Sequence, residues 1–312
     1  MAFSGGADST ALLVELVRLR LEAVLSPEPI FALHVHHGLQ PAADRFVAHV
    51  EDMCRELSSL APVALAVAHV DVPLPAGASV EAQARDARYA ALASLARRHG
   101  VGVVLLAQHA DDQVETMLIA LSRGAGIAGL AGMSAEFDRD GVHFARPLLG
   151  VSGAALRRWL VESGIAFIDD PSNADERFTR NRIRRRVLPA IEGALPTFRE
   201  TFARSARLAA QAQALLDEVA IEDSARVGEP PAIAALRQLS RPRQANVLRR
   251  WLRVHHATTP TEAQLIELLD VIAACTTRGH GIDLRIGRGH VRRDGAHLRF
   301  DPASTTGDEQ QA

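Results

Sequence analysis

The sequence contains no lysine, and all 35 of its basic residues are arginine. A Walker A loop needs a lysine that reaches the terminal phosphates of a nucleotide, and Schiff-base chemistry needs a lysine amine. Both kinds of site are therefore excluded. The planar guanidinium of arginine grips a phosphate through two hydrogen bonds at once. Local clusters of arginine are consequently candidate phosphate contacts.

Cysteine is scarce as well. Cys54 and Cys275 are the only two, they lie far apart in the sequence, and neither has an obvious set of metal ligands near it. This pattern argues against a disulfide framework, a zinc ribbon and a cysteine-ligated iron–sulfur cluster. We expect two buried thiols and no disulfide partner.

Long apolar runs are absent too. No stretch approaches the roughly 18 apolar residues of a membrane span, and the N-terminus lacks a signal-peptide pattern. We therefore expect a cytoplasmic protein without membrane contact. The net charge of −2 excludes a polycation, although local basic clusters remain. A chain of 312 residues is long enough for two domains, each with its own core.

The apolar pattern changes character along the chain. Up to residue 150, segments with helical spacing alternate with short apolar strands, which predicts a parallel sheet covered by helices on both faces. Helical spacing alone continues to about residue 215, and "RVGEPP" is typical of a linker. A helix pair is predicted over 232–274, followed by antiparallel strands over 281–300. The closing "DPASTTGDEQQA" has the composition of a disordered tail.

A glycine turn opens the sequence. In "SGGADS", Gly5 and Gly6 stand between two serines, just ahead of a helical segment. Such a turn presents backbone N–H groups and a helix N-terminus to one anion, and a Cβ at either glycine would block a phosphate. Ser4 and Ser9 add hydroxyl donors, and the acidic Asp8 makes sense there if Mg²⁺ mediates. The alternative is a tight turn in which Asp8 and Ser9 cap the helix.

The sequence "HADDQVET" brings acids to the end of a predicted strand and to the first turn of the next helix. Ligands bind at this edge of an open α/β sheet. Asp112 and Glu115 are three residues apart and share a helix face, so they could hold Mg²⁺ on a nucleotide or capture an ammonium group. Asp111 ranks below them because it could equally be the N-cap. The alternative is that the acids only complement the helix dipole.

Histidines and arginines form two further clusters. His34, His36 and His37 end a predicted strand, but alternate residues point to opposite faces, so we expect one histidine near a nucleotide rather than a metal site. "RFTRNRIRRR" places six arginines between residues 177 and 186 with no acid within the run. We interpret this run as a stripe that contacts successive backbone phosphates. The alternative is a solvated helix face.

These stretches carry a resemblance to a known family. The opening hexapeptide resembles the PP-loop of the N-type ATP pyrophosphatases, which cleave ATP to AMP and pyrophosphate. Five segments resemble, in order, those of the tRNA(Ile)-lysidine synthetases: "HVHHGLQPAADRFVAHVEDMCREL", "EAQARDARYAAL", "HADDQVETMLIALSRGAGIAGLAGM", "RPLLG" and "DDPSNADERFTRNRIRRRVLP". The likeness is specific up to about residue 190 and weaker beyond, where "NVLRRWL" and the closing strands resemble the substrate-binding domain of that family.

The resemblance implies an α/β fold. A parallel-sheet PP-loop ATPase domain of the adenine nucleotide alpha hydrolase type would be followed by a smaller, mainly helical substrate-binding domain. Four segments then follow: the PP-loop domain with its arginine-rich end over 1–190, a helical connection over 191–230, the tRNA-binding domain over 231–300 and the tail over 301–312.

The resemblance also implies a ligase that uses ATP and Mg²⁺. Its partners would be free lysine and an isoleucine tRNA with a CAU anticodon. The C2 oxygen of the wobble cytidine would attack the α-phosphorus of ATP and release pyrophosphate. The ε-amine of lysine would then displace AMP and leave lysidine.

The implied functional residues follow from the matching motifs. ATP contacts fall on Ser4, Gly5, Gly6, Ala7, Asp8, Ser9 and His34. The implied catalytic residues are Asp8, Asp112 and Glu115, and the implied metal ligands are Asp8 and Asp112. Contacts to tRNA fall on Arg85, Arg88, Arg177, Arg180 and Arg184. For Arg85 and Arg88 the alternative is an ion pair with Glu81 on the helix surface.

Two positions depart from the family's pattern. Only Met1, Ala2 and Phe3 precede the glycine turn, whereas a central parallel strand needs about five residues. We therefore expect a translation start further upstream. Gln108 stands where the family commonly has the first of two adjacent histidines, so a role for that imidazole is not expected here.

Two other functions stay open at this point. A tRNA thiolase would share the fold, although such enzymes generally need catalytic or cluster-binding cysteines. A tRNA-binding protein without activity would result if the short N-terminus disabled the site. Pyrophosphate release that requires both tRNA and lysine would separate these alternatives from a lysidine-forming ligase.

Overall fold

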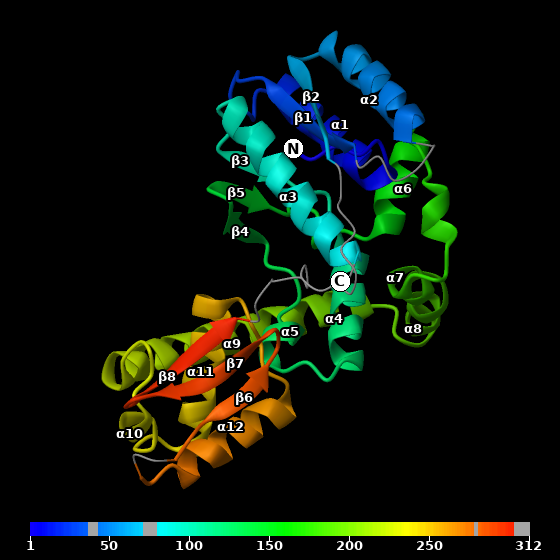
Figure 1. The fold of residues 1–312 in the computed structure, drawn as a ribbon. Coiled ribbons are helices and arrows are strands. Elements are labelled where there is room, and N and C mark those ends of the chain that lie inside the picture. Colours follow the sequence, from blue (N-terminus) through cyan, green and yellow to red (C-terminus); the bar gives the residue numbers. More distant parts are fainter. Residues whose placement is uncertain (37–42, 71–79, 278–279, 303–312) are drawn as a thin grey trace, which may run out of the picture. The chain divides into compact units, whose positions relative to one another are not determined.

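The computed structural model of the protein is shown in Figure 1. It describes residues 1–36, 43–70, 80–277 and 280–302. The chain divides into two compact units, Met1–Ala210 and Gln211–Ala312. His37 and most of the predicted tail, residues 303–312, lie outside the described residues.

The first unit begins with alternating helices and strands, as the apolar pattern predicts. These elements are α1 (Ala7–Leu21), β1 (Ile30–His36), α2 (Ala43–Ser58), β2 (Val63–His69), α3 (Val80–Arg98), β3 (Val103–Leu105), α4 (Ala110–Ser122), α5 (Ile127–Leu130), β4 (Glu136–Arg139) and β5 (Val142–Ala145). Helical elements follow: α6 (Gly153–Glu162), the 3₁₀ turn η1 (Pro171–Ala174), α7 (Thr179–Arg182), the π-helical turn η2 (Ile183–Val187), α8 (Leu188–Ala194) and α9 (Phe198–Val227).

The strands form a largely parallel sheet. β1 pairs with β2 and β3 pairs with β5 in parallel, and β4 is antiparallel to β5. The first three residues join the two halves: the N–H of Ala2 donates to the carbonyl of Leu105, and the N–H of Phe3 donates to that of Leu33, both at 2.8 Å. The resulting order is β2, β1, residues 1–3, β3, β5, β4. β4 and β5 are the strands of this sheet that the apolar pattern did not predict.

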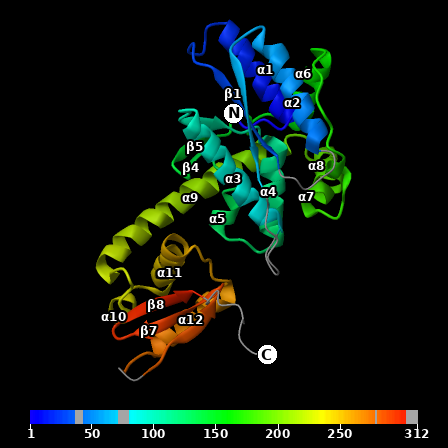
Figure 2. The same ribbon diagram turned by 45° about the horizontal axis from the view of Figure 1, so that its top comes forward.

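Helices cover both faces of this sheet because alternate strand residues point to opposite sides. Ala32 packs with α1 and α2, and its neighbour Leu33 packs with α3. Phe3 and Ala2 divide between the same two clusters, so the three N-terminal residues behave as a short central strand. The ribbon views show α3 on one side of the strands, with α1 and α2 together on the other (Figures 1 and 2).

The second unit contains the predicted helix pair and antiparallel strands. Its elements after α9 are α10 (Ile233–Leu236), α11 (Arg241–His256), α12 (Glu262–Ala274), β6 (Asp283–Ile286), β7 (Gly289–Asp294) and β8 (His297–Pro302). The strands pair in the order β6, β7, β8, and all pairs are antiparallel. Its core includes Trp251, Leu268 and Val291. Residues 301 and 302, predicted to begin the tail, belong to β8.

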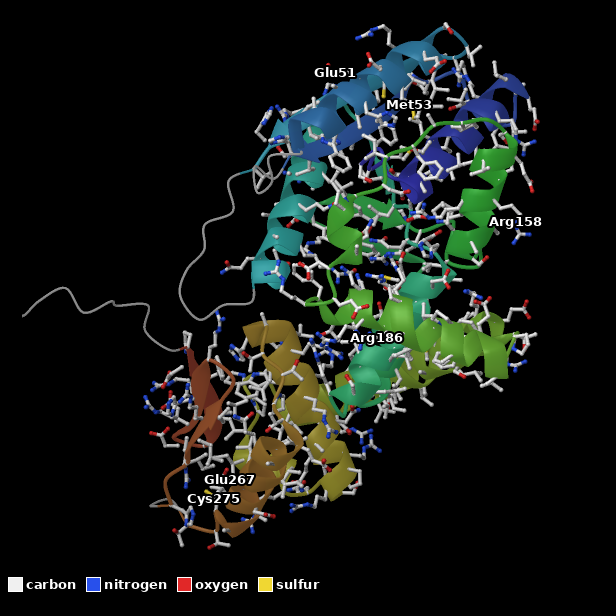
Figure 3. The ribbon with its side chains drawn as sticks, turned by 90° about the vertical axis from the view of Figure 1, so that its right-hand side faces the viewer. Glu51, Met53, Arg158, Arg186, Glu267 and Cys275 are labelled. Carbon is white, nitrogen blue, oxygen red and sulfur yellow. The ribbon has the colours of Figure 1, made fainter. Side chains whose placement is uncertain are left out.

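Both thiols are buried, as predicted. Cys54 is 4% exposed and Cys275, labelled in Figure 3, is 5% exposed. Burial raises the pKa of Cys54 to about 11. Over the ranges that the structure describes, every helix is too short or too polar to span a bilayer.

Candidate active site

The first unit contains a pocket of about 840 Å³ at the carboxyl ends of β1 and β3. Small-molecule and cofactor sites are typically about 300–1,000 Å³ in volume. Three stretches that the sequence singles out meet at this pocket: the glycine turn Ser4–Ser9, the acidic first turn of α4 and the arginine-rich segment 177–186. The implied site residues that line it are Ser4, Gly6, Ala7, Asp8, Ser9, His34, Arg88, Asp112, Arg180 and Arg184.

The glycine turn has the backbone of an anion cradle. Gly5 has φ +81°, and a Cβ there would lie 3.2 Å from side-chain atoms of His49 and Val50. Gly6 is the N-cap of α1, and no side chain caps the helix. The alternative in which Asp8 and Ser9 cap the helix is therefore wrong. The uncapped first turn lines the pocket, where its N–H groups and the helix dipole favour an anion.

Hydroxyl groups hold this turn in shape. The Oγ of Ser9 accepts from the N–H of Ser4 at 3.2 Å and donates to the carbonyl of Gly6 at 3.0 Å. The Oγ of Ser4 lies 3.0 Å from that of Ser9. On the other side, the N–H of Ile168 donates to the carbonyl of Gly5 at 3.0 Å. These hydrogen bonds fix the shape of the cradle.

His34 lies directly behind the turn. It is 5% exposed, and its Nδ1 donates to the carbonyl of Phe3 at 2.8 Å. Burial lowers the pKa of His34. A neutral ring that donates through Nδ1 leaves Nε2 as an acceptor for a ligand. His36 also lines the pocket.

His109 connects the glycine turn to the acids of α4. Its Nε2 lies 3.5 Å from a carboxylate oxygen of Asp8 and 3.5 Å from one of Asp112, and its Nδ1 lies 3.5 Å from Asp111. Burial lowers the pKa of His109, but the carboxylates of Asp111, Asp8 and Asp112 outweigh burial and raise it to about 10. With a pKa of about 10 the ring is a cation at neutral pH and lies among three carboxylates. As a cation it cannot accept through Nδ1 from the N–H of Asp111, which lies 3.2 Å away, and only the neutral ring makes that bond.

His109 is also the N-cap of α4, so the sequence-based alternative of an Asp111 cap is wrong. Asp112 completes this cap because its Oδ2 accepts from the N–H of His109 at 3.0 Å. Asp111 instead ties three elements together. Its Oδ2 accepts from the N–H of Gly153 at 2.7 Å, and its Oδ1 accepts from Nε of Arg199 at 2.5 Å. These partners, together with His109, overcome the effect of burial and hold the pKa of Asp111 well below its usual range.

Glu115 lies beneath the pocket with Arg184 over it. Glu115 has no exposed surface and does not line the pocket. Nε of Arg184 donates to Oε1 of Glu115 at 2.6 Å, and Nη2 donates to Oε2 at 3.1 Å and to Oδ1 of Asp112 at 2.8 Å. Nε of Arg180 lies 3.3 Å from Oε2 of Glu115. Burial raises the pKa of Glu115, and the two guanidinium groups oppose this effect.

Packing brings the arginines to these acids. Ile183 and Leu188 pack in one cluster with Val114 and Leu118 of α4. The π-helical turn η2 lies between α7 and α8, and such bulges often occur at functional sites. Arg180 and Arg184 therefore face the acids of α4.

The arginines of the run have acidic and backbone partners outside it, so the run is not uncompensated in the fold, and its contact with RNA phosphates stays a prediction. Besides the contacts of Arg180 and Arg184, Arg177 binds Asp175, and Arg182 donates to backbone carbonyls of residues 176 and 177. Arg185 and Arg186 pair with Glu176 (Figure 3 labels Arg186). The acids come from the residues just before the run and from α4, which a search within the run does not detect.

Arg85 and Arg88 lie on α3, and both are exposed. Arg88 lines the pocket, whereas Arg85 lies over the ring of Tyr89, 5.8 Å from its centroid. The side chain of Glu81, their alternative partner, lies outside the described residues.

Residues at or beside the site were missed from sequence, among them Arg199 and Arg146. Arg199 lines the pocket, is paired with Asp111 and Glu192, and stands 88 positions after Asp111, so no local pattern marks it. Arg146 of "RPLLG" is 6% exposed, and its Nε donates to Oε1 of Gln108 at 2.9 Å. Gln108 thus has a structural partner at the position where the family commonly has a histidine.

A nucleotide-bound Mg²⁺ fits part of this donor set. Within the described ranges, no three histidine, cysteine, aspartate or glutamate side chains are grouped to hold a metal ion. Mg²⁺ on a nucleotide needs only one or two carboxylates, because phosphates and water complete its shell. Asp8 fits this role, since its side chain is 38% exposed and lines the pocket. Asp112 fits less well, because Arg184 and the N–H of His109 already occupy its two oxygens.

Comparisons with known proteins cover nearly the whole chain. A family model described as a PP-loop domain matches residues 1–191, and one described as the TilS substrate binding domain matches residues 232–299. The tRNA(Ile)-lysidine synthase of Polaromonas naphthalenivorans is 56% identical over 304 residues, which cover 97% of this chain and 89% of that protein. The chain belongs to the tRNA(Ile)-lysidine synthase family.

Other relatives agree with this membership. The tRNA(Ile)-lysidine synthase of Bordetella parapertussis is 42% identical over 295 residues, which cover 91% of this chain and 83% of that protein. Among solved structures, a U34-tRNA thiolase from Methanococcus maripaludis matches with a TM-score of 0.56 at 14% identity, over 67% of this chain and 71% of the thiolase. That likeness reflects a shared fold. The glycine turn Ser4–Ser9 is from here on called the PP-loop.

Proposed function

We propose that this chain, as a tRNA(Ile)-lysidine synthase, joins free lysine to C2 of the wobble cytidine in an isoleucine tRNA with a CAU anticodon. ATP would be consumed to AMP and pyrophosphate. One observation carries the proposal: a single pocket combines an uncapped PP-loop with Asp112, and Glu115 lies directly beneath it, so that the two carboxylates together already hold the guanidinium cation of Arg184. The first feature suits the phosphates of ATP, and the second suits the ammonium group of lysine.

In the first step, the C2 oxygen of cytidine attacks the α-phosphorus and pyrophosphate leaves. The first-turn N–H groups of α1 and the hydroxyl of Ser4 would bind the phosphates of the leaving group. Asp8 would hold Mg²⁺ when the metal is bound, and the metal would supply positive charge to the pyrophosphate. The imidazolium of His109 keeps Asp8 in place, since Asp8 lies 3.5 Å from its Nε2.

In the second step, the ε-amine of lysine attacks C2, the C2–O bond breaks and AMP leaves with that oxygen. Lysine arrives as an ammonium ion and must lose a proton before it attacks. Asp112 and Glu115 would bind the ammonium group. Burial raises the pKa of Glu115, which suits this carboxylate to accept the proton.

The RNA would approach this pocket along arginines. Arg88 lines the pocket and is exposed, so it is a candidate contact to a phosphate next to the wobble base. Arg85 and Arg177, both exposed, are candidate contacts further out. Arg180 and Arg184 lie inside the pocket, where a phosphate would compete with Glu115 for them.

No observation favours sulfur transfer. Cys54 is buried with a raised pKa, Cys275 belongs to the second unit, and neither lines the pocket. A thiolate or a cluster ligand would have to reach the wobble base from the pocket wall.

Pyrophosphate release reports the first step and lysine transfer reports the second, so measuring both tests the two steps separately. The wild-type chain should release pyrophosphate only with tRNA, and should turn over repeatedly only with lysine. Glu115→Gln should still release about one equivalent of pyrophosphate but transfer lysine at least about 100-fold more slowly, as the loss of a general base predicts. Glu136→Gln is the matched control, because Glu136 is an exposed acid on β4, at 68% exposure. Lysine transfer by Glu115→Gln at the wild-type rate would refute the role of this acid.

A further inference from the structure

Arg184 binds both acids of the pair Asp112 and Glu115. Its guanidinium makes three hydrogen bonds of 2.6 to 3.1 Å to Glu115 and Asp112. Glu115 has no exposed surface, and the side chain of Asp112 is only 14% exposed. The guanidinium therefore stands where a second cation that used both acids would have to lie.

The remaining oxygen positions do not offer an alternative. Oδ2 of Asp112 accepts from the N–H of His109 at 3.0 Å, and Oε2 of Glu115 also faces Arg180 at 3.3 Å. Every carboxylate oxygen of the pair thus already has a donor or a cation beside it. An incoming ammonium group carries three donors and needs acceptors of its own. It must displace an existing donor to obtain them.

Arg184 is also the partner that can leave. Its side chain lines the pocket and is 35% exposed, whereas the N–H of His109 belongs to the backbone at the start of α4 and stays with Asp112. Its backbone belongs to the π-helical turn η2 rather than to a regular α-helix. A long side chain at the pocket wall can rotate toward solvent without any change in the packing of Ile183 and Leu188.

We propose that Arg184 is a specificity-determining residue that occupies the amine subsite until lysine displaces it. This inference rests on the proposed function, because it takes Asp112 and Glu115 as the acids that bind the lysine ammonium. A ligand then binds productively only if it provides a cation for the acids and enough further contacts to outweigh the loss of the Arg184 pair. A simple monoamine provides the cation but lacks the further contacts, so it does not displace Arg184 and is selected against.

Calorimetric titration of the full chain with lysine tests the displacement. Arg184→Gln removes the competing cation, so lysine should bind about tenfold or more tightly than to wild type, the size expected for charge-assisted hydrogen bonds. Arg184→Lys keeps an ammonium group near the acids and should stay close to wild type. Methylamine should bind measurably to Arg184→Gln and not to wild type. Arg158→Gln, which changes an exposed arginine of α6 that does not line the pocket (Figure 3), should leave lysine affinity unchanged.

A second measurement uses the wild-type chain, so it does not depend on the folding of Arg184→Gln. In protein labelled with ¹⁵N-arginine, the Nε–H signal that Arg184→Lys removes belongs to Arg184. Saturation with lysine should move that signal toward the position of a solvated guanidinium. The signal of Arg158 should stay where it is.

The results distinguish a failure of the Arg184 displacement from a failure of the proposed function. If wild type binds lysine but Arg184→Gln binds it no more tightly, or if the Arg184 signal is unmoved at saturation, the displacement is wrong and the proposed function stands. If wild type shows neither lysine binding nor lysine-dependent pyrophosphate release, the proposed function fails and this inference falls with it. Tighter binding by Arg184→Gln together with a shifted Arg184 signal supports both.

Discussion

The charge on His109 predicts a defined dependence of stability on pH. In the folded protein its pKa is raised to about 10, against an ordinary value of 6.5. A base whose pKa is higher in the folded state contributes stability that is complete below pH 6.5. This contribution is lost as the pH rises through about 10, because the unfolded chain then binds fewer protons than the folded one.

The size of the pKa shift of His109 sets the expected contribution of this residue to stability. Each pKa unit corresponds to about 1.4 kcal/mol, so the imidazolium and its carboxylates contribute about 4–5 kcal/mol at pH 6. Little discount for solvent applies, because the side chain of His109 is only 5% exposed. Between pH 6.5 and 10 the free energy of unfolding should fall by about 1.4 kcal/mol per pH unit through this group alone.

The assay is urea unfolding of the metal-free wild-type chain and of His109→Gln, each measured at the same series of pH values. Subtraction of the two free energies cancels the other titrating groups. The difference should be largest at pH 6 and should shrink steadily up to pH 10. A difference that stays constant over this range would show that the ring is not held as a cation, and the account of how Asp8, Asp111 and Asp112 are held together would be refuted.

Three further perturbations test other parts of the structure. Asp8→Asn should lower pyrophosphate release most strongly at limiting Mg²⁺, and equal activity at every Mg²⁺ concentration would exclude a metal role. Gly5 has φ +81°, so Gly5→Ala should cost about 1–3 kcal/mol of stability and weaken ATP binding. Gly6 has φ −75°, so Gly6→Ala should leave the fold intact. Equal melting temperatures for the two variants would contradict the strained turn. Arg243→Ala leaves the fully buried Asp223 without its two 2.7 Å hydrogen bonds and should lower the midpoint of denaturant unfolding, and an unchanged midpoint would show that Asp223 does not need this partner.

Local patterns predicted the parts of the fold and site that depend on neighbouring residues. The PP-loop and the pair Asp112 and Glu115 are each contained within one turn or helix start, so the sequence locates them. The same reasoning missed β4 and β5, although a signal was present. Asp140 and Gly141 between these strands have φ values of 51° and 73°, and Asp-Gly is a strong hairpin dipeptide.

Contacts between residues that lie far apart in the sequence could not be predicted from local patterns. Glu115 and Arg184 stand 69 residues apart, and only the packing of the arginine-rich segment on α4 brings them together. The run therefore looked uncompensated, although its partners lie on another helix and in the residues just before it. The charge of His109 was likewise hidden, because it depends on Asp8, which reaches the ring from a different element.

The most direct test of the central claim is the product on the RNA. The full chain is incubated with ATP, Mg²⁺, isotope-labelled lysine and an isoleucine tRNA transcript with a CAU anticodon, and the digested nucleosides are analysed by mass spectrometry. We predict one labelled cytidine derivative per tRNA, with equal amounts of AMP and pyrophosphate, and no label in a transcript whose wobble cytidine is replaced by uridine. Consumption of ATP without labelled nucleoside, or at a rate independent of lysine, would contradict the proposed ligation.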